Sequence, residues 1–117
     1  MLSLHEKVFH VVRNDGPDAE VSAATVFRYR QYGDVVEAEY GGGRVRVGRL
    51  VGVLDGEVLR QAYVQVNDLG ELRSGRSTIV VRRMGDRVQL IDEWEWDAGG
   101  KGTCVLEEAS PSLGGSP

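Results

Sequence analysis

The stretch Val58-Leu-Arg-Gln-Ala-Tyr-Val-Gln-Val-Asn67 lies between two turn sequences, Asp55-Gly56 before it and Asp68-Leu-Gly70 after it. Valine and tyrosine favour strands over helices, and Asp-Gly suits a tight hairpin because glycine adopts positive φ angles freely. Successive side chains of a strand point to opposite faces. The charged Arg60 marks one face as outward, so the stretch predicts a strand bounded by hairpin turns, with amides and a tyrosine facing inward.

Segments rich in valine and aromatic residues alternate with turns containing Gly and Asp along the chain. This alternation predicts strands at about residues 7–14, 25–32, 35–40, 44–54, 58–67, 72–83, 87–97 and 103–108. The one departure is the segment 19–24, Ala-Glu-Val-Ser-Ala-Ala, which follows Pro17-Asp18 and can make a short helical turn, although it is too brief for a free-standing helix.

Short turns join all the expected strands, and parallel pairing needs crossover connections of a dozen residues or more. The strands are therefore expected to form an antiparallel meander, which can stay open, form a sandwich or close. Closure alone removes both unpaired edges, and the glycines within strands, Gly48, Gly52 and Gly75, suit the bends of a barrel. We expect an all-β fold, an eight-stranded antiparallel up-and-down β-barrel.

The 117 residues are enough for one domain of ordinary size. We expect that domain to span residues 1–108. The remaining segment 109–117 is rich in Ser, Gly and Pro and is expected to be a disordered C-terminal tail.

Charge and composition exclude several classes of partner. The net charge of −4 argues against electrostatic binding to nucleic acid or to an anionic membrane. No apolar run approaches the roughly 20 residues needed to cross a bilayer, and the N-terminus lacks the pattern of a secretory signal. Cys104 is the single cysteine, which fits a reducing compartment. We expect a cytoplasmic protein with no membrane or nucleic-acid partner.

Alternation along four strands assigns an inward face of unusual polarity. Arg28 and Arg30 mark one side of the second strand as outward, and Glu37 and Glu39 do the same for the third. A dry core would select valine and leucine, because an unsatisfied buried amide costs a few kcal/mol. The expected inward set instead suggests a ligand cavity and consists of Phe27, Tyr29, Gln31, Tyr40, Tyr63, Gln65, Asn67, Trp94 and Trp96.

Several short motifs follow one another in a set order and spacing: Phe27-Arg-Tyr-Arg-Gln31, Ala38-Glu-Tyr-Gly-Gly42, Tyr63-Val-Gln-Val-Asn67 with Gly70-Glu-Leu72, Glu93-Trp-Glu-Trp96, and Lys101-Gly-Thr103 with Glu107-Glu108. Over about residues 9–108 they resemble a family of small bacterial proteins often labelled N-acetylglutamate synthase-like. The resemblance implies a small calycin-like or avidin-like β-barrel.

The activity in that family label does not follow from the sequence. Acetyl transfer from acetyl-CoA usually depends on a glycine-rich loop leading into a helix that holds the pyrophosphate, and the chain shows neither. Relatives tend to have histidine within the Tyr-x-His-x-Asn strand, whereas this chain has Gln65. The resemblance therefore carries no acid/base role over to this position.

Other polar residues are weighed against simpler interpretations. Asp92, Glu93, Glu95, Glu107 and Glu108 form an acidic group that can divide acid and base roles if one member is desolvated, but such a group is more often a solvated edge. His5 and His10 lack the spacing of metal ligands, so we expect no metal, and we expect no cofactor. One guanidinium of the set Arg44, Arg46 and Arg49 can reach the barrel mouth and hold a ligand carboxylate.

The sequence thus predicts a barrel that binds a small molecule in an aromatic and amide-lined cavity. The first alternative is a cofactor-independent cyclase or isomerase that uses the same cavity. The second is a filled barrel that serves as an interaction module through the outward residues Ala62, Val64 and Val66. We also expect a homodimer, because these residues otherwise add to an exposed apolar patch.

Overall fold

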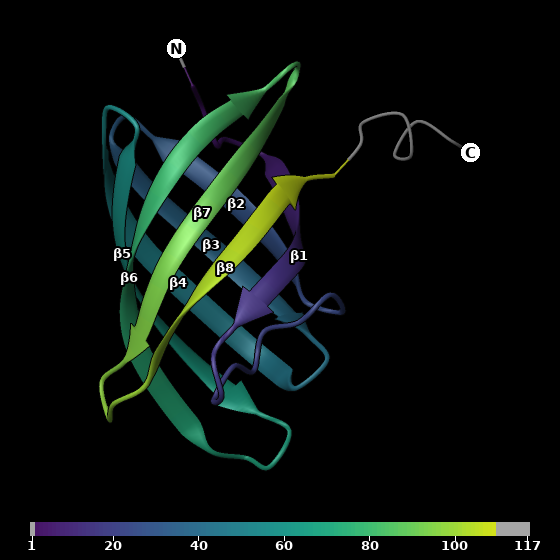
Figure 1. The fold of residues 1–117 in the computed structure, drawn as a ribbon. Coiled ribbons are helices and arrows are strands. Elements are labelled where there is room, and N and C mark those ends of the chain that lie inside the picture. Colours follow the sequence, from purple (N-terminus) through teal and green to yellow (C-terminus); the bar gives the residue numbers. More distant parts are fainter. Residues whose placement is uncertain (1, 110–117) are drawn as a thin grey trace.

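The structure is a computed structural model that describes residues 2–109, and within them the chain forms a single closed barrel (Figure 1). The predicted all-β, eight-stranded antiparallel barrel is confirmed. Of the predicted tail 109–117, residues 110–117 lie outside the described residues, and Ala109 donates its backbone N–H to Val8 O at 2.8 Å. The strands are β1 (Lys7–Asp15), β2 (Val26–Tyr32), β3 (Val35–Gly42), β4 (Val45–Asp55), β5 (Val58–Asn67), β6 (Leu72–Met84), β7 (Arg87–Trp96) and β8 (Lys101–Glu108).

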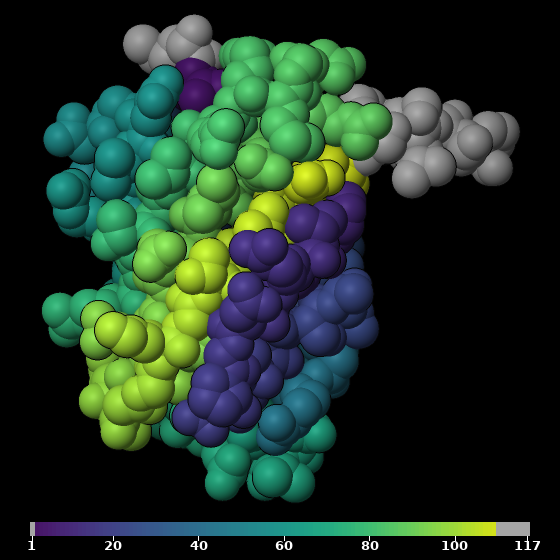
Figure 2. All heavy atoms as spheres, in the orientation of Figure 1, coloured from purple at the N-terminus to yellow at the C-terminus, as the bar shows by residue number. Residues whose placement is uncertain are grey.

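Each strand pairs antiparallel with the next, and β8 returns to pair with β1. The space-filling view shows these two strands side by side, as adjacent purple and yellow bands (Figure 2). The register shifts between Val11 and Arg13, so a bulge lies on this closing pair. Closure leaves neither edge of the sheet unpaired, which is the expected advantage of a barrel.

The alternation read from the sequence places the inward faces of β2, β3, β5 and β7 correctly. Phe27, Tyr29, Val36, Ala38 and Tyr40 are buried, whereas the charged residues between them are exposed. The sequence did not indicate which face of β4, β6 and β8 points inward. The structure shows these inward residues: Val45, Gly48, Leu50 and Gly52 on β4, Gly75, Ser77, Ile79 and Val81 on β6, and Cys104 and Leu106 on β8.

The two ends of the barrel differ in chemistry. The upper end in Figure 1 carries the N-terminal segment, and Leu4 closes it: the side chain is fully buried, and Leu4 N donates to Gln31 Oε1 at 2.9 Å. Aliphatic residues such as Leu59, Ile79 and Leu90 fill the interior there. The inward residues of the lower half are mostly aromatic or polar, with a few aliphatic residues such as Val45 among them, so a binding site is expected in this half.

The short helical turn that residues 19–24 could have formed is absent. Residues 16–25, which we call the plug loop, form an irregular connection with two isolated turns, closed by Ala19 N to Gly16 O at 3.3 Å and Thr25 N to Ser22 O at 2.9 Å. The plug loop lies at the lower end of the barrel, at the thin purple-to-blue connection between β1 and β2 (Figure 1). Long-range contacts to the barrel wall, described below, outweigh the weak local helix preference of so short a segment. Within residues 2–109, no helix is long and apolar enough to cross a membrane.

Inward glycines make room for the aromatic rings of the lower half. A Cβ atom on Gly48 would collide with the ring of Tyr40, and one on Gly75 would lie 2.5 Å from the Tyr63 hydroxyl oxygen. The contact at Gly48 involves ring carbons of a tyrosine that is itself buried and stacked. These glycines are therefore required by packing rather than by backbone conformation.

We predict that Gly48→Ala destabilises the barrel by about 1–3 kcal/mol, because an added methyl group overpacks a rigid aromatic site. Urea unfolding measures the difference. The matched control is Gly41→Ala, whose added Cβ would find its nearest neighbour at an ordinary 3.5 Å and which we expect to change stability by less than about 0.5 kcal/mol. Equal effects of the two substitutions would contradict the packing explanation.

Candidate ligand-binding site

Five aromatic side chains from four strands gather in the lower half of the barrel. Trp94 and Trp96 of β7 meet edge to face with ring centroids 5.9 Å apart, and Tyr63 of β5 meets Trp96 in the same way at 5.6 Å. Phe27 of β2 stacks on Tyr40 of β3 at 4.5 Å, with an angle of 14° between the rings. Together they provide flat apolar walls of the kind that line ligand pockets.

These rings surround an interior cavity of about 40 Å³. By volume it holds roughly three water molecules. It is lined by Asn14, Ala19, Glu20, Val21, Phe27, Tyr40, Leu50, Gln61, Tyr63, Asp92, Trp94, Trp96 and Cys104. Three of these residues, 19–21, belong to the plug loop, so the loop forms one wall of the cavity.

Asp92 lies on the cavity wall with an unsatisfied oxygen. Its Oδ1 and the hydroxyl oxygen of Ser77 are both buried without a hydrogen-bond partner. Burial raises the pKa of Asp92 to about 7, because the ionised carboxylate loses solvation inside the barrel. Asp92 is thus the desolvated member of the acidic group seen in the sequence, whereas Glu93 and Glu95 are exposed on the outer face.

Glu20 of the plug loop enters the barrel and is buried there. Its Oε1 accepts a hydrogen bond from Gln65 Nε2 at 2.9 Å, and its Oε2 accepts bonds from Asn67 Nδ2 at 2.8 Å and the Arg73 guanidinium at 3.0 Å. Burial alone would raise the pKa of Glu20, but the hydrogen bonds from Asn67, Gln65 and Arg73 outweigh it and lower the pKa below its usual value. Glu20 is therefore held as an anion.

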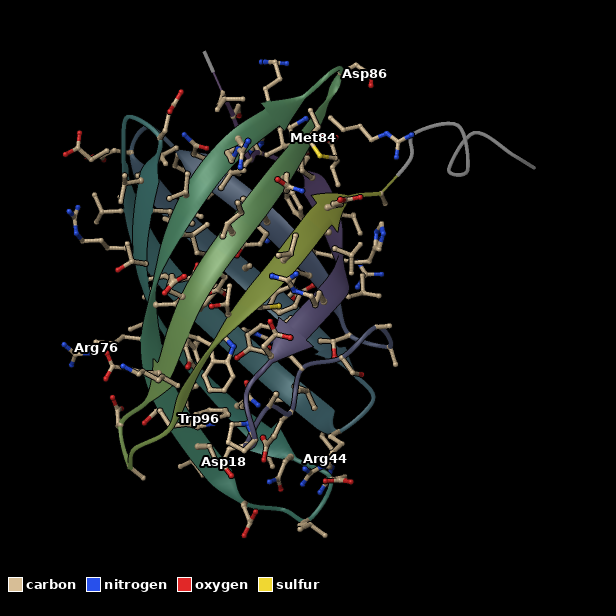
Figure 3. All side chains as sticks on the ribbon, in the orientation of Figure 1. Asp18, Arg44, Arg76, Met84, Asp86 and Trp96 are labelled. Atoms are coloured by element: carbon tan, nitrogen blue, oxygen red, sulfur yellow. The ribbon has the colours of Figure 1, made fainter. Side chains whose placement is uncertain are left out.

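The end of β1 and the plug loop accept hydrogen bonds from the indole N–H groups of the two tryptophans. Trp94 Nε1 donates to Asn14 Oδ1 at 2.8 Å, and Asn14 Nδ2 donates in turn to Val21 O at 2.8 Å. Trp96 Nε1 donates to Asp18 O at 3.2 Å. Figure 3 shows Trp96, Asp18 and Arg44 near the same end of the barrel. In this closed arrangement both indole N–H groups are satisfied within the protein.

The structure brings most of the predicted site residues together. Phe27, Tyr40, Tyr63, Trp94 and Trp96 line the cavity, and the remaining four lie around or away from it. Gln65 and Asn67 lie beside the cavity and hold Glu20. Tyr29 is buried in the core, where its hydroxyl donates to Gln61 Oε1 at 3.4 Å. Gln31 lies at the opposite end, holding Leu4.

Sequence reasoning missed Glu20 and Arg73. Glu20 lies in the segment expected to be a helical turn, although the connection around it is much longer than the tight turns elsewhere, which is the signal that marks a loop able to fold inward. Arg73 points inward near the start of β6 and stacks on Trp96, with its guanidinium carbon 3.9 Å from the ring centroid. Of the three arginines considered for the barrel mouth, Arg44 comes within 3.9 Å of Glu20 Oε2.

No group of three or more His, Cys, Asp or Glu side chains suited to a metal ion occurs in the part of the chain that the structure describes. Burial raises the pKa of the Cys104 thiol well above its usual range, and also the pKa values of the Tyr40 and Tyr63 phenols. These groups are neutral near pH 7. They offer hydrogen bonds and contact surface rather than a nucleophile.

A family model described as "Avidin-like protein" matches residues 2–109, which is the whole described part of the chain. No curated protein and no solved structure matches the chain. The match agrees with the closed barrel and with the avidin-like resemblance of the motifs. Nothing in these comparisons supports the N-acetylglutamate synthase-like label.

We predict that Asp92→Asn stabilises the protein at pH 8 more than at pH 5. In the unfolded chain the Asp92 carboxyl titrates near pH 4, whereas its folded pKa is about 7. The folded state therefore binds the extra proton between these values, and the stability contributed by Asp92 is lost as pH rises through 7. A pKa difference of one between the two states corresponds to about 1.4 kcal/mol of stability, so a gain of a few kcal/mol is expected.

Urea unfolding at the two pH values measures this difference. The control is Glu37→Gln, which removes an exposed carboxylate from the outer face of β3, and the pH dependence of Asp92→Asn is judged against it. Glu20 stays ionised over this range, since its pKa is lowered. A pH-independent effect of Asp92→Asn would show that this carboxylate is not desolvated.

Proposed function

This chain belongs to the avidin-like protein family, and on that premise we propose that it binds a small molecule inside the lower half of its barrel. An eight-stranded barrel encloses an interior that is either filled by side chains or holds one small ligand. Here the aliphatic half is filled and the aromatic half keeps a cavity. The family and this division of the interior both support a binding function.

The observation that carries the proposal is the unpaired Asp92 oxygen on the cavity wall, with the Ser77 hydroxyl close to it. A buried polar atom without a partner costs about 1–3 kcal/mol, and Asp92 Oδ1 and Ser77 Oγ are two such atoms near the aromatic rings. A ligand with an N–H or O–H group facing Asp92 would recover that cost. Its flat or apolar body would stack on Trp94 and Trp96.

The size of the cavity means that the plug loop must move when a ligand enters. About 40 Å³ is far below the roughly 300 Å³ or more of a typical ligand pocket. Residues 19–21 contribute small or flexible side chains to this wall, and their removal would join the cavity to the lower mouth of the barrel. We therefore propose that Phe27, Tyr40, Tyr63, Trp94 and Trp96 contact the ligand after the loop has opened.

A cofactor-independent cyclase or isomerase is a second candidate, favoured by Asp92 alone. With a pKa of about 7 its carboxyl group is shared between protonated and ionised forms at neutral pH, which suits a general acid or base. The same cavity would then hold the substrate, and Asp92 would exchange a proton with it. Turnover of a bound compound separates this function from binding alone.

Self-association is a further proposal, and it concerns the outer face of the barrel. Val51 and Val53 of β4 are more than half exposed, and Val35 and Val64 are exposed on the strands to either side. The register places Val53 opposite Val35 and Val51 opposite Ala62, so the valines form one continuous patch. A second copy of the chain would cover this patch and form a homodimer.

We predict that small planar compounds carrying an N–H or O–H donor change the tryptophan fluorescence and raise the melting temperature. Asp92→Leu and Ser77→Ala should each weaken such binding by about 1–3 kcal/mol, because neither new side chain can form a polar contact. Glu37→Gln, on the outer face of β3, is the control and should leave affinity unchanged. If the compound is a substrate, Asp92→Asn should also lower kcat.

The filled-barrel interpretation makes the opposite prediction for the same screen. No compound would then perturb the fluorescence or the melting temperature, and Ser77→Ala would be neutral or stabilising. Such a result, obtained over a broad panel of compounds, would contradict both the proposed ligand binding and the proposed cyclase or isomerase activity.

We predict that the protein is a dimer and that Val51→Lys makes it a monomer, because a buried ammonium group in the interface would be desolvated without a partner. Sedimentation velocity over a range of concentrations measures the oligomeric state. Val12→Lys on β1 is the matched control, since Val12 is 48% exposed but lies outside the valine patch. A wild-type monomer at all concentrations would contradict the prediction.

A further inference from the structure

Glu20 is the feature on which the inference depends. It is 3% exposed, although it belongs to a loop without helix or strand structure. All three of its hydrogen-bond donors, Gln65, Asn67 and Arg73, belong to β5 and β6 of the barrel wall and none to the loop itself. The carboxylate therefore sits in a site built by the barrel.

The barrel holds each of these donors in place without help from Glu20. The Tyr40 hydroxyl donates to Gln65 Oε1 at 2.7 Å, which directs Gln65 Nε2 toward the carboxylate. Two backbone N–H groups of the β5–β6 turn donate to Asn67 Oδ1 at 3.0 and 2.9 Å, which fixes the orientation of Asn67 Nδ2. The Arg73 guanidinium lies over the ring of Trp96. The site would keep its shape if the loop withdrew.

The charges around the site suit a single carboxylate. Arg73 supplies one positive charge by direct contact, and Arg44 adds a second at 3.9 Å. The acidic residues Asp68 and Glu71 lie next to it, since Asp68 pairs with Arg44 at 3.2 Å and Glu71 accepts a bond from Asn67 Nδ2 at 2.8 Å. A dianion such as phosphate would be repelled by these two groups, whereas a monoanion with two oxygens matches the three donors.

The site and the cavity are neighbours separated by the loop. Glu20 both occupies the site and lines the cavity, and Ala19 and Val21 on either side of it also line the cavity. Trp96 is shared, since one face carries Arg73 and its ring borders the cavity. Withdrawal of residues 19–21 would therefore leave one continuous space with an anion site at the mouth and aromatic walls behind it.

We propose that Gln65, Asn67 and Arg73 form a carboxylate-binding subsite, that Glu20 occupies it as an internal substitute for the ligand, and that the ligand is a small organic monocarboxylate with an apolar or aromatic body. This inference rests on the proposed binding function and adds the chemical class of the ligand. Binding exchanges one carboxylate for another, so the ligand displaces Glu20 and opens the plug loop in the same step.

The first experiment is rescue of Glu20→Ala by a free carboxylate. Acetate at constant ionic strength should raise the melting temperature of Glu20→Ala, because it fills the vacated subsite, whereas acetamide should not. Neither compound should act on the wild type, where Glu20 competes, nor on Glu20→Gln, where the amide fills the space. Asp18→Ala is the matched control, since it removes an exposed carboxylate from the same loop.

The second experiment asks whether the subsite and the cavity bind one molecule. 3-Phenylpropionate should quench the tryptophan fluorescence of Glu20→Ala. Its affinity for this variant should be at least about tenfold higher than that of acetate, because a tenfold gain needs only about 1.4 kcal/mol from the phenyl group. The neutral amide of the same acid should bind at least about tenfold more weakly. Adding Arg73→Gln to Glu20→Ala should abolish the preference for the acid over the amide.

The outcomes separate this inference from the binding function. If the acid and its amide bind Glu20→Ala equally, the carboxylate subsite is refuted while cavity binding stands. If neither acetate nor 3-phenylpropionate acts on folded Glu20→Ala, the inference is overturned and Glu20 is a structural ion pair only. If Glu20→Ala does not fold in buffer, refolding in acetate but not in acetamide supports the subsite, and refolding in neither overturns it.

Discussion

The interior volume of a closed eight-stranded barrel is the constraint on which the rest of this structure depends. Once β8 pairs with β1, the inward side chains must fit a space of nearly fixed size. The aliphatic half meets this limit with leucine, isoleucine and valine. The aromatic half meets it by opposing large rings to residues without a side chain, as Tyr40 lies over Gly48 and Tyr63 over Gly75. The position of the cavity follows from this pairing of tyrosine rings with glycines.

The polar lower half needs a different means of closure. Glutamine, asparagine and arginine inside a barrel must be paired, because unsatisfied buried groups cost as much as a well-packed methyl group contributes. The plug loop supplies that pairing by inserting Glu20 among Gln65, Asn67 and Arg73. A buried ion pair of this kind is seldom the most stable solution, since apolar residues of similar volume often serve as well or better. The proposed exchange of Glu20 for a ligand carboxylate gives this ion pair a use that does not depend on stability.

Much of the fold was predictable, and particular residues show why. Arg28, Arg30, Glu37 and Glu39 mark outward faces without ambiguity, so the alternation of β2 and β3 could be read directly from the sequence. The inner faces of β4 and β6 could not, because glycine and serine alternate there with arginine and valine. Their direction is set by contacts with neighbouring strands, such as the fit of Gly75 against Tyr63, which a single sequence does not display.

The residues of the candidate site also differ in whether local sequence pattern or long-range contacts determine their positions. The aromatic wall was found because each ring lies on a strand whose orientation local alternation determines. Glu20 was missed because its position depends on partners 45, 47 and 53 residues away in the chain, and no local pattern encodes such pairs. The helical turn expected at 19–24 would have kept this carboxylate in solvent, and three donors on the barrel wall outweigh so small a helix preference. In the proposed exchange, a ligand carboxylate replaces Glu20 on its three donors, and the bonds from Trp96 to Asp18 O and from Asn14 to Val21 O must open as well before the loop can leave the mouth of the barrel.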